Sequence, residues 1–234
     1  MLTFDPEPKI STNYVYYTFN SIITPNIFYK DNNILVLDNV LTDIECNDII
    51  NFKDPTKYKI CINFNDLSNI IENRCESFLQ NIYNYQNNWC YKNINPNWRL
   101  VEAPKNRTLS KHFDGVNVIS VDEKSIYTIM IYLKDSDGDL KFNNNLHFTP
   151  KCGRVVIFNQ ALLHEGLKNN NHIKYFIRSE LMFTRTISIE TFNDKLAMEI
   201  YTHARKEPHT EKSRLLEEKA FELSELLENI ILNI

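Results

Sequence analysis

The feature that most constrains how this chain can fold is the tripeptide His112-Phe113-Asp114, followed much later by His164. Side chains at positions i and i+2 of a β-strand point to the same face, so His112 and Asp114 can bind one ion if residues 108–114 run extended. Two imidazoles and one carboxylate form the facial triad that holds iron(II) and leaves open coordination positions. A chain that uses this triad must bring His164 beside His112 from a distant strand.

The tripeptide alone has low specificity, because a His-x-Asp motif often arises by chance. The residues that follow it raise that specificity. Residues 127–133 (YTIMIYL) are β-branched and aromatic and lie between polar turns, which predicts a buried strand with Thr128, Met130 and Tyr132 on one face. Further strands are predicted at 140–142, 154–158 and 172–184, with a loop at 143–145 and a turn at 150–153.

The last predicted strand places Lys174, Phe176 and Arg178 on one face. An inward lysine or arginine is costly to bury without an anionic partner. A bound dicarboxylate would provide that partner, and a neighbouring acid such as Glu180 or Glu102 is the alternative.

Four segments carry a resemblance to a known family. In order and spacing, LSKHFDG, SIYTIMIYLKDSDGDLKF, TPKCGRVVIFNQALLHEG and KYFIRSELMF resemble the iron(II)- and 2-oxoglutarate-dependent dioxygenases of the prolyl 4-hydroxylase type. The resemblance covers residues 33–185, because ILVLDNVLTDIECNDIINF is similar to the family's first strand and helix. It implies a mainly β fold with flanking helices (α+β) and a double-stranded β-helix, or jelly-roll, core at 33–186. Residues 1–32 would then be an N-terminal leader and 187–234 a C-terminal helical extension.

The resemblance also implies roles for individual residues. His112, Asp114 and His164 match the iron ligands. Lys174 matches the cation that pairs with the far carboxylate of 2-oxoglutarate, and Tyr132 matches a tyrosine that hydrogen-bonds the same carboxylate.

Two further residues are candidates for the co-substrate pocket. Arg178 is the alternative anion partner, since an arginine offers a bidentate fork where a lysine offers a point charge. Thr128 shares a strand face with Tyr132 and is included among the co-substrate contacts. Asn159 and Gln160 could orient His164, although ordinary loop amides would look the same in sequence.

The chain departs from the family pattern at two places. Glu102 stands where relatives carry a strand tyrosine, and a second carboxylate near iron would be unfavourable unless Arg99, Arg107 or the metal compensates its charge. The family's Gly-Gly-x-Thr becomes residues 137–140 (DGDL), which keep the second glycine and lose the threonine. Neither change removes a metal ligand.

The activity that the resemblance implies is hydroxylation of an unactivated C–H bond, with release of succinate and carbon dioxide. Iron(II) and 2-oxoglutarate are the expected cofactor and co-substrate, with ascorbate a candidate auxiliary. The expected substrate is a peptidyl proline or another protein residue. The alternatives are a non-catalytic interaction protein that keeps the fold, or an oxygenase acting on nucleic acid or a small molecule.

Composition narrows the partners and the compartment. The net charge is −4 without a long basic run, so neither a nucleic-acid partner nor a membrane partner is expected. The first residues lack the pattern of a signal peptide, and no stretch is apolar for long enough to span a bilayer. Five scattered cysteines without a CxxC pair fit free thiols in a reducing compartment, so we expect a cytoplasmic protein.

Helices are predicted on both sides of the strand region. Thr42 and Glu45 form a capping box that opens a helix to Phe52, and residues 66–83 repeat apolar positions at helical spacing, with Cys75 in the core. Residues 190–206 and 210–234 are expected to be two more helices. The second has an apolar seam, which we expect to pack on the preceding helix or the barrel, with a homodimer contact as the alternative. Its members are Leu216, Ala220, Leu223, Leu227, Ile230 and Ile234. Four histidines are not expected to bind the metal, namely His147, His172, His203 and His209.

Overall fold

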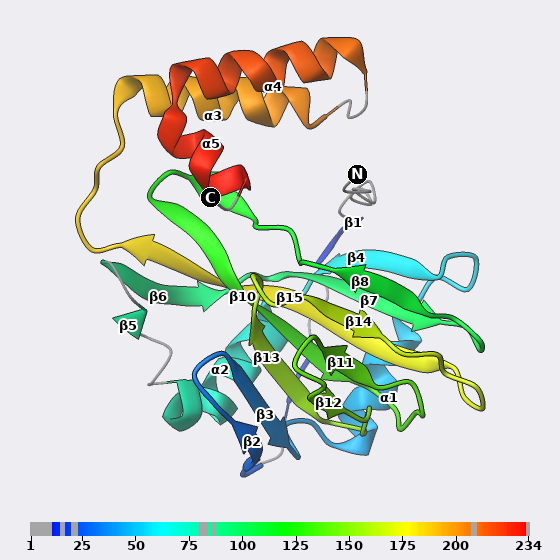
Figure 1. The fold of residues 1–234 in the computed structure, drawn as a ribbon. Helices are drawn as coiled ribbons and strands as arrows, with labels where there is room; N and C mark the ends of the chain where they lie inside the picture. Colours follow the sequence, from blue (N-terminus) through cyan, green and yellow to red (C-terminus); the bar gives the residue numbers. More distant parts are fainter. Residues whose placement is uncertain are drawn as a thin grey trace.

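Two β-sheets face each other in the computed structural model, and helices flank them on the outside (Figure 1). The predicted mainly β fold with flanking helices and a jelly-roll core is therefore confirmed. The structure describes residues 11–14, 17–19, 23–79, 84–85, 88–206 and 210–232.

The larger sheet has eleven strands and carries more than half of the buried hydrophobic residues. Its main path runs in the order β1 (Ser11–Tyr14), β4 (Lys59–Asn63), β7 (Asn97–Ala103), β15 (Lys174–Arg185), β10 (Glu123–Tyr132), β13 (Val155–Asn159), β3 (Ile34–Asp38) and β2 (Asn26–Lys30). Three strands join it off this path, namely β5 (Asn84–Tyr85), β6 (Trp89–Ile94) and β9 (Val118–Ser120).

The smaller sheet has four strands and carries two of the three candidate metal ligands. Its order is β12 (His147–Phe148), β11 (Leu140–Phe142), β14 (His164–Gly166) and β8 (Leu109–His112). Each strand predicted from sequence is present. β10 starts before the predicted position, because its first residues pair with the end of β15 in a register that begins at Glu123 and Thr184.

Two helices close the outer face of the larger sheet, α1 (Asp43–Asn51) and α2 (Asn65–Leu79). The predicted capping box is present, because the Glu45 amide donates to the Thr42 hydroxyl at 3.2 Å and Glu45 accepts from the Thr42 amide at 2.8 Å. Cys75 lies in the core as expected, and burial raises the pKa of its thiol to about 12. The predicted end of the second helix, at residues 80–83, lies outside the described residues.

The turn at 150–153 depends on its glycine. Gly153 has a φ of 73°, and a Cβ at this position would lie 2.1 Å from the Leu41 carbonyl oxygen. Any other residue would therefore meet both backbone strain and a steric clash.

The C-terminal extension consists of α3 (Phe192–Ala204), α4 (Glu211–Leu223) and α5 (Glu225–Leu232), which lie together above the sheets in Figure 1. The prediction of one continuous helix over 210–234 is wrong, because the backbone is extended at Ser224. The Ser224 hydroxyl donates to Asp194 at 2.5 Å and accepts from the Leu227 amide at 2.9 Å, so it ends α4 and caps α5.

The apolar seam packs within the chain. A small buried cluster joins the seam residues Ala220, Leu227 and Ile230 to Ala197 of α3 and Val121 beside β9. This agrees with packing on the preceding helix and the barrel. Self-association through these helices stays a prediction, as do the domain boundaries at 32/33 and 186/187. In the part of the chain that is described, no helix has the length and apolarity needed to cross a membrane.

Candidate metal and co-substrate site

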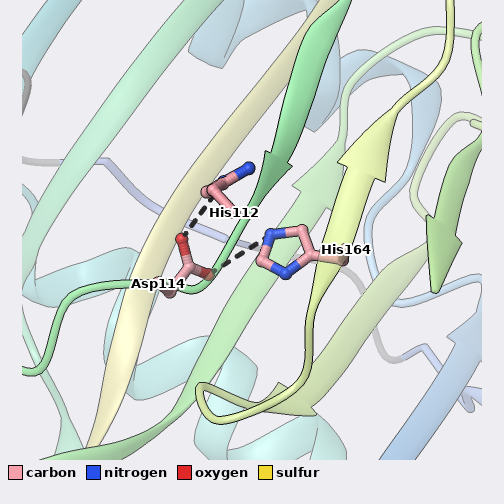
Figure 2. Close-up of side chains that lie close together, drawn as sticks. All are labelled: His112, Asp114 and His164. Carbon is pink, nitrogen blue, oxygen red and sulfur yellow. Dashed lines mark ion pairs between the residues drawn. The ribbon is translucent and has the colours of Figure 1, made fainter. Parts of the chain in front are cut away.

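The three predicted metal ligands meet at the junction of β8 and β14. These strands pair antiparallel with His112 opposite His164, and Asp114 follows in the segment just beyond β8 (Figure 2). Nε2 of His112 lies 3.8 Å from Oδ1 of Asp114, and Nε2 of His164 lies 3.8 Å from Oδ2. All three ligand atoms lie within 4.8 Å of one another. Strand pairing thus assembles the triad from residues far apart in sequence.

Both histidines are held in the tautomer that a metal requires. Nδ1 of His112 lies 2.8 Å from the Ser110 carbonyl oxygen, and Nδ1 of His164 lies 2.9 Å from that of Leu162. Because a carbonyl can only accept, each Nδ1 carries the proton and each Nε2 keeps its lone pair. Burial lowers the pKa of His164 despite the nearby Asp114 carboxylate, so this ligand is neutral at neutral pH.

Asn159 and Gln160 make side-chain hydrogen bonds to groups other than His164, and their role in orienting His164 stays a prediction. The Asn159 side chain accepts from the Ala161 amide at 2.9 Å, and Gln160 accepts from the Ser125 hydroxyl at 2.9 Å. The Leu162 backbone carbonyl holds Nδ1 of His164, which residue identity in the sequence does not reveal.

Asp114 is buried and is held through both of its oxygens. Arg178 donates from Nη1 to Oδ1 at 2.7 Å, and the Thr128 hydroxyl donates to Oδ2 at 2.6 Å. Burial alone would raise the pKa of Asp114, but Arg178, His164 and the Thr128 hydrogen bond outweigh it and lower the pKa to about 2. The carboxylate is therefore ionised and fixed in orientation.

Lys174 lies on the same face of β15 as Arg178 and is buried. Its ammonium group donates to the Gly138 carbonyl at 2.7 Å. Burial lowers its pKa, against the opposing charges of Asp139 and Asp137. A Cβ on Gly166 would lie 3.8 Å from this nitrogen, and Gly166 is two residues after His164 on β14. The buried cation thus lies beside the strand that supplies a metal ligand.

Tyr132 lies between the two sheets and is almost fully buried. Burial raises the pKa of its phenol, and the charge of Asp139 raises it further. Tyr132 pairs with Phe176 in the β10–β15 register, and Phe176 is two residues after Lys174 on the same face of β15. Asp139 itself lies 2.6 Å from Nδ1 of the exposed His147.

Sequence patterns did not identify Asp139 or Gly166 as residues of the site. Strand periodicity could have identified Gly166, because it falls two residues after His164 on a strand and so lies on the same face. Among the other histidines, His172 and His203 are exposed, and His209 lies outside the described residues.

Glu102 does not approach the triad. It lies opposite Tyr175 in the β7–β15 register. Its Oε2 lies 2.5 Å from Nζ of Lys53, a residue just after the end of α1. Glu102 is therefore not the second carboxylate near the metal that the sequence suggested. Arg99 and Val101 occupy the alternate positions of β7, opposite Arg178 and Phe176.

Comparisons with known proteins identify the fold. No protein-family model and no curated protein sequence matches this chain. Among solved structures, the viral collagen prolyl hydroxylase of Paramecium Bursaria Chlorella virus-1, as its 2OG complex, is similar with a TM-score of 0.51 and 20% identity over 65% of this chain and 96% of that chain. A truncated form of the viral protein gives a TM-score of 0.51 and 19% identity over 65% and 90%. For a Pseudomonas putida prolyl-4-hydroxylase the TM-score is 0.46, and the sequence identity is 12% over 66% of this chain and 94% of that chain. The chain thus shares the fold of the viral hydroxylase.

Proposed function

We propose that this chain is an iron(II)- and 2-oxoglutarate-dependent dioxygenase that hydroxylates an unactivated C–H bond of a peptidyl proline or another protein residue. The products would be succinate, carbon dioxide and the hydroxylated residue. The observation that carries the proposal is a two-histidine, one-carboxylate triad whose ligand atoms lie within 4.8 Å, with the buried cation of Lys174 beside β14, the strand of His164. The fold shared with a prolyl hydroxylase supports it.

The donor set fits iron(II). His112, Asp114 and His164 would hold the ion through two imidazole nitrogens and one carboxylate oxygen, which is the facial set that leaves positions open for other ligands. A closed structural zinc site would need a fourth protein ligand, and within the described residues the cluster contains three. When bound, iron and 2-oxoglutarate supply the oxidative chemistry that amino-acid side chains cannot perform.

The protein orients the ligands before any metal binds. Arg178 and Thr128 fix the two oxygens of Asp114 and keep it ionised. Carbonyls of Ser110 and Leu162 hold the Nδ1 protons, so both Nε2 lone pairs stay available. Hydrogen bonds to the far side of metal ligands commonly tune metal affinity in this way.

Lys174 is the residue that we assign to the far carboxylate of 2-oxoglutarate. Its charge is buried, so a dicarboxylate would supply the anionic partner that burial makes favourable. Gly166 leaves room beside the ammonium, and the Tyr132 hydroxyl can donate to the same carboxylate. Arg178 is assigned to Asp114 instead, as is Thr128. Ascorbate is proposed only as an auxiliary reductant.

The proposal is tested by product analysis. Purified protein would be incubated with iron(II), 2-oxoglutarate, oxygen and a library of proline-containing peptides, and peptides gaining one oxygen atom would be identified by mass spectrometry. The matched controls are the His112→Ala variant and omission of 2-oxoglutarate. We expect oxygen gain only in the complete wild-type reaction. Equal oxygen gain in the controls would contradict the proposal.

A further inference from the structure

Strand β8 is an edge of the smaller sheet. Among the described residues it pairs with β14 on one side, and no strand pairs with its other side. Residues 104–111, which lead into β8 and form most of it, are all exposed. On a free edge, backbone N–H and C=O groups of alternate residues point outward without a partner. β8 can therefore accept another extended chain.

This edge is basic in a chain whose net charge is −4. Lys105, Arg107 and Lys111 are exposed, and residues 103–113 contain no aspartate or glutamate. The Arg107 guanidinium lies 5.8 Å from the ring centroid of Tyr58, so its side chain is directed along the surface near β4. A partner that complements this edge is acidic.

The same edge exposes apolar surface and leads to the triad. Leu109 and Phe113 are each 50% exposed, and Phe113 lies between two metal ligands in the sequence. The His112 side chain is 28% exposed, and a Cβ built on Gly115 has no atom within 4 Å. An extra strand lies about 4.8 Å from its neighbour, so its inward side chains would be next to His112.

We propose that β8 is the docking strand for an acidic, extended peptide segment, which pairs with the free edge by β-strand addition. Acidic side chains of the peptide would meet Lys105, Arg107 and Lys111, and one inward residue would be delivered to the triad. Backbone pairing supplies affinity in this binding mode, and side chains supply specificity. Delivery to the triad rests on the proposed function, whereas docking itself does not.

A peptide fits this edge better than a nucleic acid does. The groups that β8 offers are amides and carbonyls at strand spacing, which match another polypeptide backbone. A nucleic acid would need the positive charge alone, and its binding would not depend on peptide amides.

Docking is tested with a fluorescently labelled peptide of alternating Glu and Val, measured by anisotropy on metal-free protein in chelator. Two modified forms of the peptide would be compared with the parent, one N-methylated at every Glu amide and the other at every Val amide. On the protein side, the Lys111→Glu variant would be compared with Lys219→Glu. Lys219 is exposed on α4 and its reversal changes the net charge equally. We expect Lys111→Glu and one N-methylated form to weaken binding about tenfold or more, and Lys219→Glu to change it less than about twofold.

Several results would overturn the docking proposal. These are equal affinities for both N-methylated forms and the parent peptide, equal effects of Lys111→Glu and Lys219→Glu, or full competition by a single-stranded oligonucleotide together with no effect of N-methylation on peptide binding. Succinate formation by the wild-type protein would be measured separately. Succinate without peptide binding would overturn docking alone, and peptide binding without succinate would overturn the proposed function alone.

Discussion

Replacing Lys174 by methionine removes the buried charge that we assign to 2-oxoglutarate while keeping an unbranched apolar stem. Lys174 is 7% exposed, so the contact it would make with a carboxylate is shielded from water. A hydrogen bond to a charged group contributes about 1.5–3 kcal/mol. Its loss corresponds to a roughly 10- to 150-fold weaker affinity for 2-oxoglutarate.

The assay is chemical denaturation with saturating manganese(II) in place of iron(II), so that no turnover occurs. At a 2-oxoglutarate concentration about 100 times the wild-type Kd, the ligand should raise the free energy of unfolding by about 2.7 kcal/mol. If Lys174→Met weakens binding about 30-fold, the same concentration is about 3 times the new Kd and the increment falls to about 0.9 kcal/mol. The increment is measured against each protein without ligand, which removes any change in intrinsic stability.

Arg178→Met is the matched control from the same strand face. Because Arg178 binds the Asp114 carboxylate at 2.7 Å, its loss should weaken metal binding. With metal saturating, we expect the 2-oxoglutarate increment to change by less than about 0.5 kcal/mol. The opposite ranking, with the increment lost in Arg178→Met and kept in Lys174→Met, would refute the assignment of the anion site.

Three further predictions concern the triad, a buried ion pair and a turn. Asp114→Ala should weaken metal binding and abolish succinate formation while the far-ultraviolet circular dichroism stays unchanged, and wild-type turnover would mean that Asp114 is not a ligand. Burial opposes ionisation of Glu45, but hydrogen bonds from Arg74 and the helix start hold its pKa below the usual value. The stabilising contribution of the ionised Glu45 is therefore present above about pH 4.5 and is lost as the pH falls further. Between about pH 6 and pH 3, the urea midpoint of Glu45→Gln should fall less than that of the wild type. Parallel falls of the two midpoints would contradict this prediction. Gly153→Ala should lower the free energy of unfolding by about 2 kcal/mol or more in urea titrations, because the turn has a φ of 73° and no space for a Cβ, and a loss under about 0.5 kcal/mol would show that the turn rearranges freely.

Local strand periodicity predicted that His112 and Asp114 share a face and located several strands, whereas His164 was assigned by the resemblance of whole segments. His112 and Asp114 are two residues apart, and residues 127–133 are β-branched and aromatic, so both patterns follow from strand geometry. The capping box of Thr42 and Glu45 is equally local. These features need no knowledge of what packs where.

The face on which Glu102 lies could not be predicted in this way. A shift of one residue moves a side chain to the opposite face of a sheet, and the pairing of Glu102 with Tyr175 is set by strands far apart in sequence. The position of Lys53, which pairs with Glu102, depends on α1 as well.

The break at Ser224 has a similar cause. The seam of apolar residues continues through it, so helical periodicity alone predicts no interruption. The hydroxyl of Ser224 instead binds Asp194, thirty positions earlier in the chain, and the helix ends there. Backbone carbonyls orient the two histidines, and their positions also arise only once the strands have paired.

The central claim is that His112, Asp114 and His164 hold iron for oxidation of 2-oxoglutarate, and uncoupled succinate formation tests it most directly. Wild-type protein and the His112→Ala variant would be given iron(II), 2-oxoglutarate and oxygen, with parallel reactions lacking each component. We predict succinate from the wild-type protein that requires iron, oxygen and the His112 imidazole. Wild-type succinate no higher than that of His112→Ala, with or without added peptides, would contradict the claim.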